Sequence, residues 1–276
     1  MPRKLYEKIE DDKKDEIIKK YISGLSIDKL QEIYPQYGRN RIYRMLKENC
    51  VMRNDSEKSR KYGYNKDFFK VIDTEEKAYW LGFIYADGYI VNGIKGKNND
   101  SLGITLSNKD KEHIEKFKKS IDSNHPIRIY KSKYGSNSAR IIIQDEELVA
   151  DLIELGVLRN KSLILKFPTT DMVDKSLIYH FIRGYFDGDG SFKKKGQKLN
   201  GYDFSVLGTI EFLTELRTYL GVDNEIRKCN KNNDSNNYHL TFGGNQKVKQ
   251  VANMLYGNAN IYLDRKYKRY REIENM

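Results

Sequence analysis

The fold is decided by two nine-residue stretches: residues 80–88 read WLGFIYADG, and residues 182–190 read IRGYFDGDG. When Gly82 is laid on Gly184, Asp87 falls on Asp189, and the offset between the copies is 189 − 87 = 102 residues. In both copies an apolar helical stretch ends in an aspartate that is followed by glycine. Glycine readily takes the left-handed conformation just past a helix, so we expect Asp87 and Asp189 to end two helices.

The repeat continues downstream of both stretches. Strand 102–107 corresponds to strand 202–207, helix 109–121 to helix 209–220, and strand 140–144 to strand 238–242. A repeat of this length predicts two similar structural units. We therefore predict an α+β fold made of duplicated αββαββα halves related by a pseudo-twofold axis, at residues 75–165 and 174–276, the second with a basic C-terminal segment.

Small residues recur at a spacing of four in both copies, as Gly82 with Ala86 and as Gly184 with Gly188. This spacing places them on one helix face, which lets two helices approach closely and brings the two aspartates together. A carboxylate at a helix C-terminus is disfavoured by about 0.3–1 kcal/mol. Two facing carboxylates need a compensating charge, and Mg²⁺ supplies it while keeping sites for phosphate oxygens. Metal-assisted phosphodiester hydrolysis is the expected chemistry.

Two such motifs at this spacing, each followed by the same order of strands and helices, resemble the two-motif LAGLIDADG homing endonucleases over about residues 75–274. The resemblance implies a monomer whose antiparallel sheets lie in the major groove of a long, nearly palindromic double-stranded DNA site. It also implies that Asp87 and Asp189 bind divalent metal, Mg²⁺ or in its place Mn²⁺, with Gly88 and Gly190 beside it. The implied biological role is the spread of a mobile genetic element, as in intron homing.

Members of this family often carry a lysine after the last helix of each half, near the metal. By position this role falls to Lys161 and Lys266, whose alternative is a solvated or phosphate-contacting side chain. The sequence departs from the family pattern at Arg183, where a small residue is usual, and at the sixth motif position. That position holds Tyr85 in the first copy and Asp187 in the second, where Asp187 could support the metal ligands.

The N-terminal segment has the pattern of three short helices, at residues 13–22, from residue 27 and at residues 39–49, with Ser26 as a helix N-cap. The third helix presents Arg41, Arg44 and Lys47 at three-residue steps. We predict a helix-turn-helix DNA-binding module at residues 1–52; an ordinary helical bundle with a solvated basic face is the alternative. Residues 53–74 are charged and are predicted to be a linker.

The chain of 276 residues has 50 Lys and Arg against 39 Asp and Glu, a net charge of 50 − 39 = +11, which favours a polyanionic partner. Candidate contacts to DNA are donors on or near the predicted strands, and strand register decides which of them share a face. These candidates are Arg128, Tyr130, Lys131, Arg140, Gln144, Lys193, Lys195, Arg227 and Lys228.

Several protein classes are disfavoured. No apolar run approaches the ~20 residues of a membrane span, and we expect an intracellular protein of the cytoplasm or nucleoid. Cys50 and Cys229 form no CxxC pair, and the four histidines have no zinc-site spacing.

The serious alternative to a nuclease is a non-cleaving protein of the same fold, either a DNA-binding regulator or a maturase that binds RNA. Retention of both aspartates favours the nuclease, because a carboxylate at a helix C-terminus costs stability.

Overall fold

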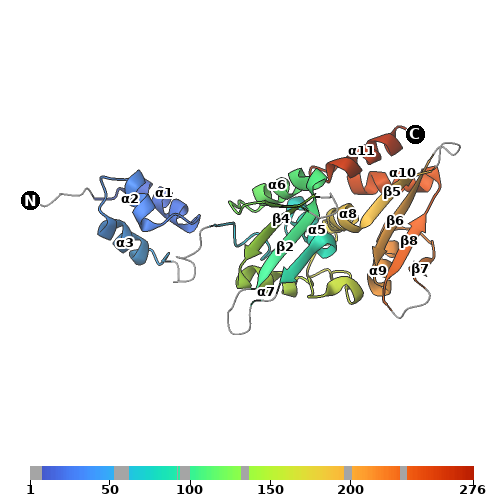
Figure 1. Cartoon of the computed structure of the whole chain (residues 1–276), viewed down its shortest axis with the longest axis horizontal. Helices are drawn as coiled ribbons and strands as arrows, with labels where there is room; N and C mark the ends of the chain where they lie inside the picture. The colour runs from blue at the N-terminus through green and yellow to red at the C-terminus, as the bar shows by residue number, and fades with distance from the viewer. Residues whose placement is uncertain are drawn as a thin grey trace, which may run out of the picture. The chain divides into compact units, whose positions relative to one another are not determined.

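The computed structural model describes residues 8–52, 62–91, 93, 100–131, 137–195, 201–230 and 235–276 (Figure 1). These residues form two compact units. The smaller comprises the described residues up to Asn65 together with Ile121–His125, and the larger comprises those of Lys66–Ser120 and Pro126–Met276. Within the described ranges, no helix combines the length and apolarity that a membrane crossing requires.

The smaller unit contains three helices, α1 (Asp11–Ile22), α2 (Ile27–Ile33) and α3 (Arg39–Glu48). Ser26 accepts a hydrogen bond of 3.1 Å from the backbone N–H of Lys29, which satisfies a free donor at the start of α2, as predicted. The helices enclose a small apolar core in which five side chains are at most 1% exposed: Ile17, Tyr21, Leu30, Ile42 and Leu46.

The segment predicted as a linker, residues 53–74, is described from residue 62 onward. Inside it, Phe68 and Phe69 are 5% and 1% exposed, and their rings meet edge to face at 4.8 Å between centroids. Lys66 and Lys70 pair with Glu147 at 3.3 and 3.4 Å. The larger unit therefore begins at Lys66, ahead of the first motif helix.

The larger unit consists of two halves with the same order of elements, which confirms the predicted fold class. The first half contains α5 (Glu75–Asp87), β1 (Gly88–Val91), β2 (Ser101–Ser107), η1 (Asn108–Asp110), α6 (Lys111–Ser120), β3 (Arg128–Lys131), β4 (Asn137–Gln144), α7 (Glu146–Glu154) and η2 (Lys161–Leu163). The second half contains α8 (Ile178–Asp189), β5 (Gly190–Lys194), β6 (Tyr202–Gly208), α9 (Ile210–Leu220), β7 (Ile226–Lys228), β8 (Tyr238–Phe242), α10 (Asn245–Tyr256) and a further helix, α11 (Asp264–Glu274).

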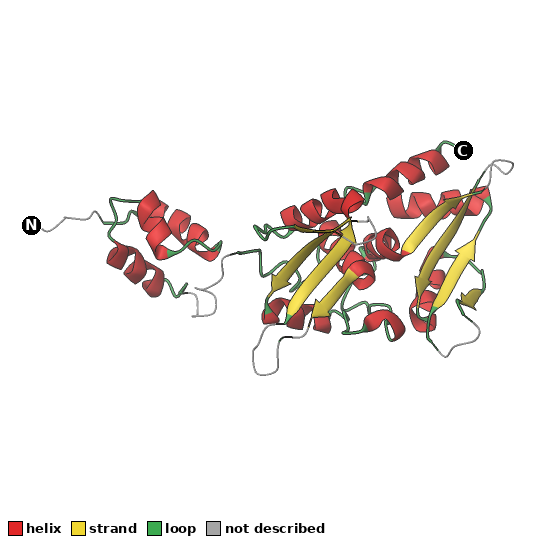
Figure 2. Cartoon of the chain, in the orientation of Figure 1, coloured by secondary structure: helices red, strands yellow, loops and turns green. Residues whose placement is uncertain are grey.

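Each half has one four-stranded antiparallel sheet, in the order β1-β2-β4-β3 or β5-β6-β8-β7. Side chains alternate across the sheets, so that Ile104 and its partner Ile141 are buried whereas their neighbours Thr105 and Arg140 lie on the other face. Helices α6 and α7 contact the first sheet, and α9 and α10 contact the second (Figure 2). The apolar face of each sheet thus meets helices, and the other face carries the polar side chains.

Helices α5 and α8 lie side by side in the middle of the larger unit (Figure 1). Residues 78–85 of α5 and 181–187 of α8 are all buried, so both helices are enclosed on every side. A helix that is apolar around its whole circumference belongs in a core. The two motif copies therefore form the centre of the larger unit.

Candidate active site

Four small residues lie where α5 and α8 meet, and three of them leave no room for a larger side chain. A Cβ atom on Gly82 would lie 2.0 Å from the carbonyl oxygen of Phe181, and one on Gly184 would lie 1.9 Å from that of Tyr79. A Cβ atom on Gly188 would lie 2.3 Å from the Cβ of Ala86. The structure thus brings together the four residues expected at the helix interface, and the two backbones touch.

Both motif helices end at their aspartates, as expected. The glycines that follow, however, do not take the left-handed conformation that commonly ends a helix. Gly88 and Gly190 have extended conformations, with φ of −76° and −94°, and the expectation of a left-handed conformation was wrong. Glycine is required here by close packing instead. A Cβ atom on Gly88 would lie 2.7 Å from Cγ2 of Ile84, and one on Gly190 would lie 2.0 Å from the ring of Phe186.

The close helix packing brings the carboxylates of Asp87 and Asp189 into electrostatic contact. Burial, reinforced by the charge of Asp189, raises the pKa of Asp87 from 3.8 to about 6, against the opposing effect of nearby lysines. Burial also raises the pKa of Asp189, although Lys161 and Lys266 oppose the shift. Both ionised carboxylates are therefore held in an environment that disfavours their negative charge.

Two lysines complete the site in a nearly symmetric way. Lys161, in η2, donates a hydrogen bond from Nζ to the carbonyl of Gly88, and Lys266, in α11, donates to the carbonyls of Gly190 and Phe186. Burial lowers the pKa of Lys161, while Asp189 and Asp87 oppose this shift. Burial lowers the pKa of Lys266 to about 8. Both lysines thus lie beside the two aspartates, with Lys266 buried and Lys161 half-buried.

The donor set at the helix ends, two carboxylates and two glycine carbonyls, suits a hard divalent cation that keeps several of its waters. Among the described residues, no group of three or more His, Cys, Asp and Glu side chains could hold a metal. Mg²⁺ binds through only one or two carboxylates and completes its shell with waters and phosphate oxygens. The carbonyls of Gly88 and Gly190, expected beside the metal, accept the lysine hydrogen bonds and retain a second lone pair.

The raised pKa of Asp87 predicts that this carboxylate destabilises the metal-free protein at neutral pH. Because its folded-state pKa of about 6 exceeds 3.8, the cost is absent below about pH 4, grows as the pH rises and is complete above pH 6. At 1.36 kcal/mol per pKa unit, we expect Asp87→Asn to raise the free energy of unfolding at pH 8 by about 1–3 kcal/mol. Urea denaturation in EDTA measures this. An equal effect at pH 4.5 and pH 8 would contradict the assignment.

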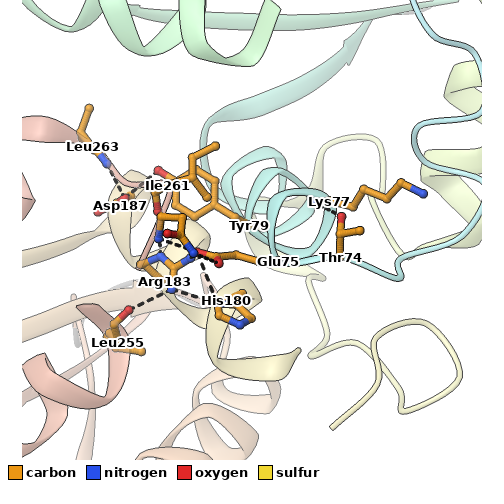
Figure 3. A network of polar contacts seen from close by, with 11 residues as sticks. Thr74, Glu75, Lys77, Tyr79, His180, Arg183, Asp187, Leu255, Ile261 and Leu263 are labelled. Carbon is orange, nitrogen blue, oxygen red and sulfur yellow. Dashed lines mark hydrogen bonds and ion pairs between the residues drawn. The ribbon is translucent and has the colours of Figure 1, made fainter. Parts of the chain in front are cut away.

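Arg183, the departure from the family pattern, is a structural anchor (Figure 3). It is 2% exposed and donates to Glu75 at 2.7 Å, to the carbonyl of Leu255 at 3.0 Å and to that of Ile261 at 2.9 Å. Glu75 also accepts hydrogen bonds from the backbone and side chain of Asn260, both at 2.8 Å. The network ties the start of α5, the end of α10 and the approach to α11 together, and the sequence reasoning missed every partner.

The candidate DNA-contacting residues lie on the polar faces of the two sheets. Residues that pair directly across antiparallel strands share a face. Seven candidates share the face opposite the helices: Arg128, Tyr130, Arg140 and Gln144 in the first sheet, and Lys193, Lys195 and Arg227 in or beside the second. Lys131 and Lys228 alternate to the other face, so strand alternation removes them from the candidate surface.

Arg140 is held in place on the polar face of the first sheet. Its Nε donates to the hydroxyl of Thr105 at 3.1 Å, and its guanidinium lies 4.6 Å from the ring centroid of Tyr130. The hydroxyl of Tyr89 lies 3.0 Å from that of Thr105. These residues come from all four strands and form a row across the sheet, which orients one arginine before any ligand binds.

In the smaller unit, the three cations expected to contact DNA lie together on α3. Arg41, Arg44 and Lys47 are exposed, whereas Ile42 and Leu46 on the same helix are buried. The helix therefore has one apolar and one basic face, as its sequence pattern predicts.

Comparison with known proteins finds a similarity between part of the second half and LAGLIDADG-like domains. A family model described as a LAGLIDADG-like domain matches residues 176–255. The meganuclease I-SmaMI bound to uncleavable DNA is 16% identical, with 71% of this chain and 88% of that chain covered and a TM-score of 0.47. The LAGLIDADG homing endonuclease I-GzeII, in complex with its DNA target, is 16% identical, with 72% and 88% covered and a TM-score of 0.49.

The meganuclease I-CpaMI bound to uncleaved DNA is 13% identical, with 74% of this chain and 92% of that chain covered and a TM-score of 0.48. No curated protein sequence matches the chain. The family model covers α8, both aspartates of that helix and the whole second sheet. Residues 176–255 are therefore similar to a LAGLIDADG-like domain.

Proposed function

We propose that this chain is a site-specific, divalent-metal-dependent endonuclease that cuts double-stranded DNA, with one active centre in each half. The observation that carries the proposal is the pairing of Asp87 with Asp189 at two adjoining helix ends, with a lysine added by each half, half-buried Lys161 and buried Lys266. Half-buried carboxylates with raised pKa values beside amines are costly for a fold and useful to a catalyst.

The proposed chemistry is hydrolysis of phosphodiester bonds. Bound Mg²⁺, or Mn²⁺ in its place, would neutralise the carboxylate pair and stabilise the charge that develops on the phosphate. Asp87 and Asp189 would hold it through their carboxylate oxygens. Lys266, whose pKa lies near 8, exchanges a proton readily at neutral pH and would orient or deprotonate an attacking water. Lys161 would do the same in the other centre.

The polar faces of the two sheets are proposed to bind the two halves of the DNA site in its major groove. A net charge of +11 favours a polyanion, and each face presents Lys or Arg donors suited to guanine edges and phosphates. The halves repeat one order of elements with different side chains, which suits a long and nearly palindromic site read by a monomer.

The smaller unit is proposed to add a second DNA contact. Its helix α3 exposes Arg41, Arg44 and Lys47 on one face, and the proposed module spans residues 1–52. A module tethered to the nuclease through a short segment raises the affinity by its effective concentration and extends the footprint. The helix-turn-helix assignment and the linker belong to this proposal; of residues 53–74, predicted as the linker, those from Lys66 onward are part of the larger unit.

Cleavage of a randomised duplex library tests the proposed function. We expect cuts at one long sequence in Mg²⁺, none in EDTA, and binding without cutting in Ca²⁺. Specific duplex binding with no cut in Mg²⁺ or Mn²⁺ would favour a DNA-binding regulator. Preferential binding of folded RNA would favour a maturase.

Arg140 is predicted to determine base preference in one half-site. Because Thr105 and Tyr130 already hold its guanidinium, little side-chain freedom is lost on binding. We expect Arg140→Ala to weaken binding by about 10- to 100-fold and to relax the preference for guanine at one position. Site selection in Ca²⁺ measures both effects. Lys131→Ala is the matched control, since this residue alternates to the other face, and an unchanged preference in both variants would contradict the prediction.

A further inference from the structure

Asp187 is a second carboxylate on α8, two residues before half-buried Asp189, and it is fully enclosed. Its Oδ1 accepts a hydrogen bond of 2.5 Å from the hydroxyl of Tyr256, in α10. Its Oδ2 accepts from the hydroxyl of Tyr79, in α5, at 2.6 Å and from the backbone N–H of Leu263 at 2.7 Å (Figure 3). Three donors from three segments thus converge on one carboxylate, which is what the burial of such a group requires.

The orientation of the Tyr79 hydroxyl follows from its neighbours. It has one proton, which it gives to Asp187, so Nε2 of His113, 3.0 Å away, must donate to the phenol oxygen. Burial lowers the pKa of His113 to about 3, and a neutral imidazole has one N–H for this purpose. The chain from His113 through Tyr79 therefore points one way, towards Asp187.

The Leu263 contact connects Asp187 to Lys266. Leu263 precedes α11, and its carbonyl accepts the backbone N–H of Lys266 at 2.9 Å. The Lys266 amine donates to the carbonyls of Phe186 and Gly190, which lie on either side of Asp187 in the chain, and it sits 4.8 Å from the ring centroid of Phe186. Helix α8 thus holds the start of α11 through the carboxylate of Asp187. It holds the amine of Lys266 through the backbone carbonyls of Phe186 and Gly190.

The first half places its lysine by other contacts. Tyr85 occupies the position aligned with Asp187, and its hydroxyl donates to the carbonyl of Leu155 at 2.5 Å, at the end of α7. Lys161 follows six residues after Leu155 and reaches the carbonyl of Gly88. The carboxylate anchor therefore belongs to one half only.

We propose that Asp187 is a positioning residue for Lys266 and acts in one active centre only; the part that Lys266 plays in cleavage rests on the proposed function. In Asp187→Leu, which keeps the approximate size of the side chain and removes both acceptor oxygens, the three buried donors lose their partner. The first turn of α11 then loses its anchor and Lys266 moves from its place, whereas Lys161 does not.

Amine labelling tests this placement without DNA or metal. Lys266 is 4% exposed in the wild type and should react slowly with an N-hydroxysuccinimide ester, as read by mass spectrometry of its peptide. In Asp187→Leu we expect its labelling rate to rise by about 10-fold or more, because an unsatisfied buried donor favours local opening. The rate at Lys161 should stay unchanged. Tyr256→Phe, which removes one donor and keeps the carboxylate, should give a smaller rise, and Tyr270→Phe in α11 none.

Cleavage of a duplex labelled separately on each strand tests the consequence for the reaction. Lys161→Met and Lys266→Met identify the strand that depends on each lysine. We expect Asp187→Leu to slow the Lys266-dependent strand by about 10- to 100-fold, as loss of a supporting contact does, and to accumulate nicked product. The other strand should be cut at nearly the wild-type rate.

The outcomes separate the two proposals. Unchanged labelling of Lys266, or equal increases at Lys161 and Lys266, would overturn the positioning role, as would equal slowing of both strands. A wild type that cuts neither strand in Mg²⁺ or Mn²⁺ would refute the nuclease function, and the labelling would still decide whether Asp187 places Lys266.

Discussion

Asp87→Asn and Asp189→Asn are each expected to reduce double-strand cleavage by at least about 1,000-fold while the protein still binds its DNA site in Ca²⁺. The carboxylate pair is the part of the site that fits a divalent cation, and neither aspartate lies on the polar faces of the sheets. Loss of about 4 kcal/mol of transition-state stabilisation, at 1.36 kcal/mol per tenfold change, gives this factor. Single-turnover cleavage and filter binding measure the two quantities separately.

The control for this experiment is Asp174→Asn, an exposed aspartate whose side chain accepts hydrogen bonds from Ser176. Asparagine can keep those bonds, so we expect wild-type cleavage. Cutting by Asp87→Asn at a tenth of the wild-type rate or more would contradict a role in holding the metal. Loss of binding together with cutting would instead show that the aspartate supports the fold.

The duplicated fold could be predicted because its signals are local and occur twice. Two aspartate-glycine helix ends and two alternating strand patterns at one offset define the halves. The face of Arg128, Arg140 and Arg227 was left open by the sequence, because a period of two fixes the face only once the strand register is known. The conformation of Gly88 and Gly190 was predicted wrongly, since the clash that demands glycine involves a side chain one turn earlier in the helix.

The sequence contains a signal that favours Lys266 over most of the other cations at residues 265–271. Lys266, Tyr270 and Ile273 are the buried residues of α11, and their spacing of four and three is that of an inward helix face. Arg265, Lys268 and Arg271 do not share that face. The helical period therefore narrows the choice to Lys266 and Arg269, and Arg269 pairs with Glu272 at 2.7 Å.

The supporting networks could not be predicted from the sequence. Glu75 and Asn260 are 185 residues apart, and Tyr79 and Asp187 are 108 apart. Such pairs follow from how the two halves pack, which local propensity does not encode. The departures from the family pattern at Arg183 and Asp187 did indicate where the halves differ. Which residues these two side chains contact could be seen only in the three-dimensional arrangement.

Gly184→Ala is expected to lower the free energy of unfolding by about 3 kcal/mol or more, because the new methyl group forces α5 and α8 apart. Its Cβ would lie 1.9 Å from the carbonyl oxygen of Tyr79 and 2.8 Å from the backbone nitrogen of Phe83, and backbone atoms cannot rotate away. Alanine gains about 1 kcal/mol over glycine in helix propensity, which is too little to offset the clash. Gly82→Ala should behave alike, since its Cβ would lie 2.0 Å from the carbonyl of Phe181.

Gly221→Ala separates the packing clash from ordinary backbone strain. Gly221 has a φ of +63° with no atom within 4 Å of a Cβ, so alanine there should cost only about 1 kcal/mol through its left-handed conformation. Urea denaturation at pH 7 gives all three values. If Gly184→Ala loses no more stability than Gly221→Ala, the helices are not in backbone contact. The metal affinity of a folded Gly184→Ala protein should fall as well, because the same helix contact sets the separation of Asp87 and Asp189.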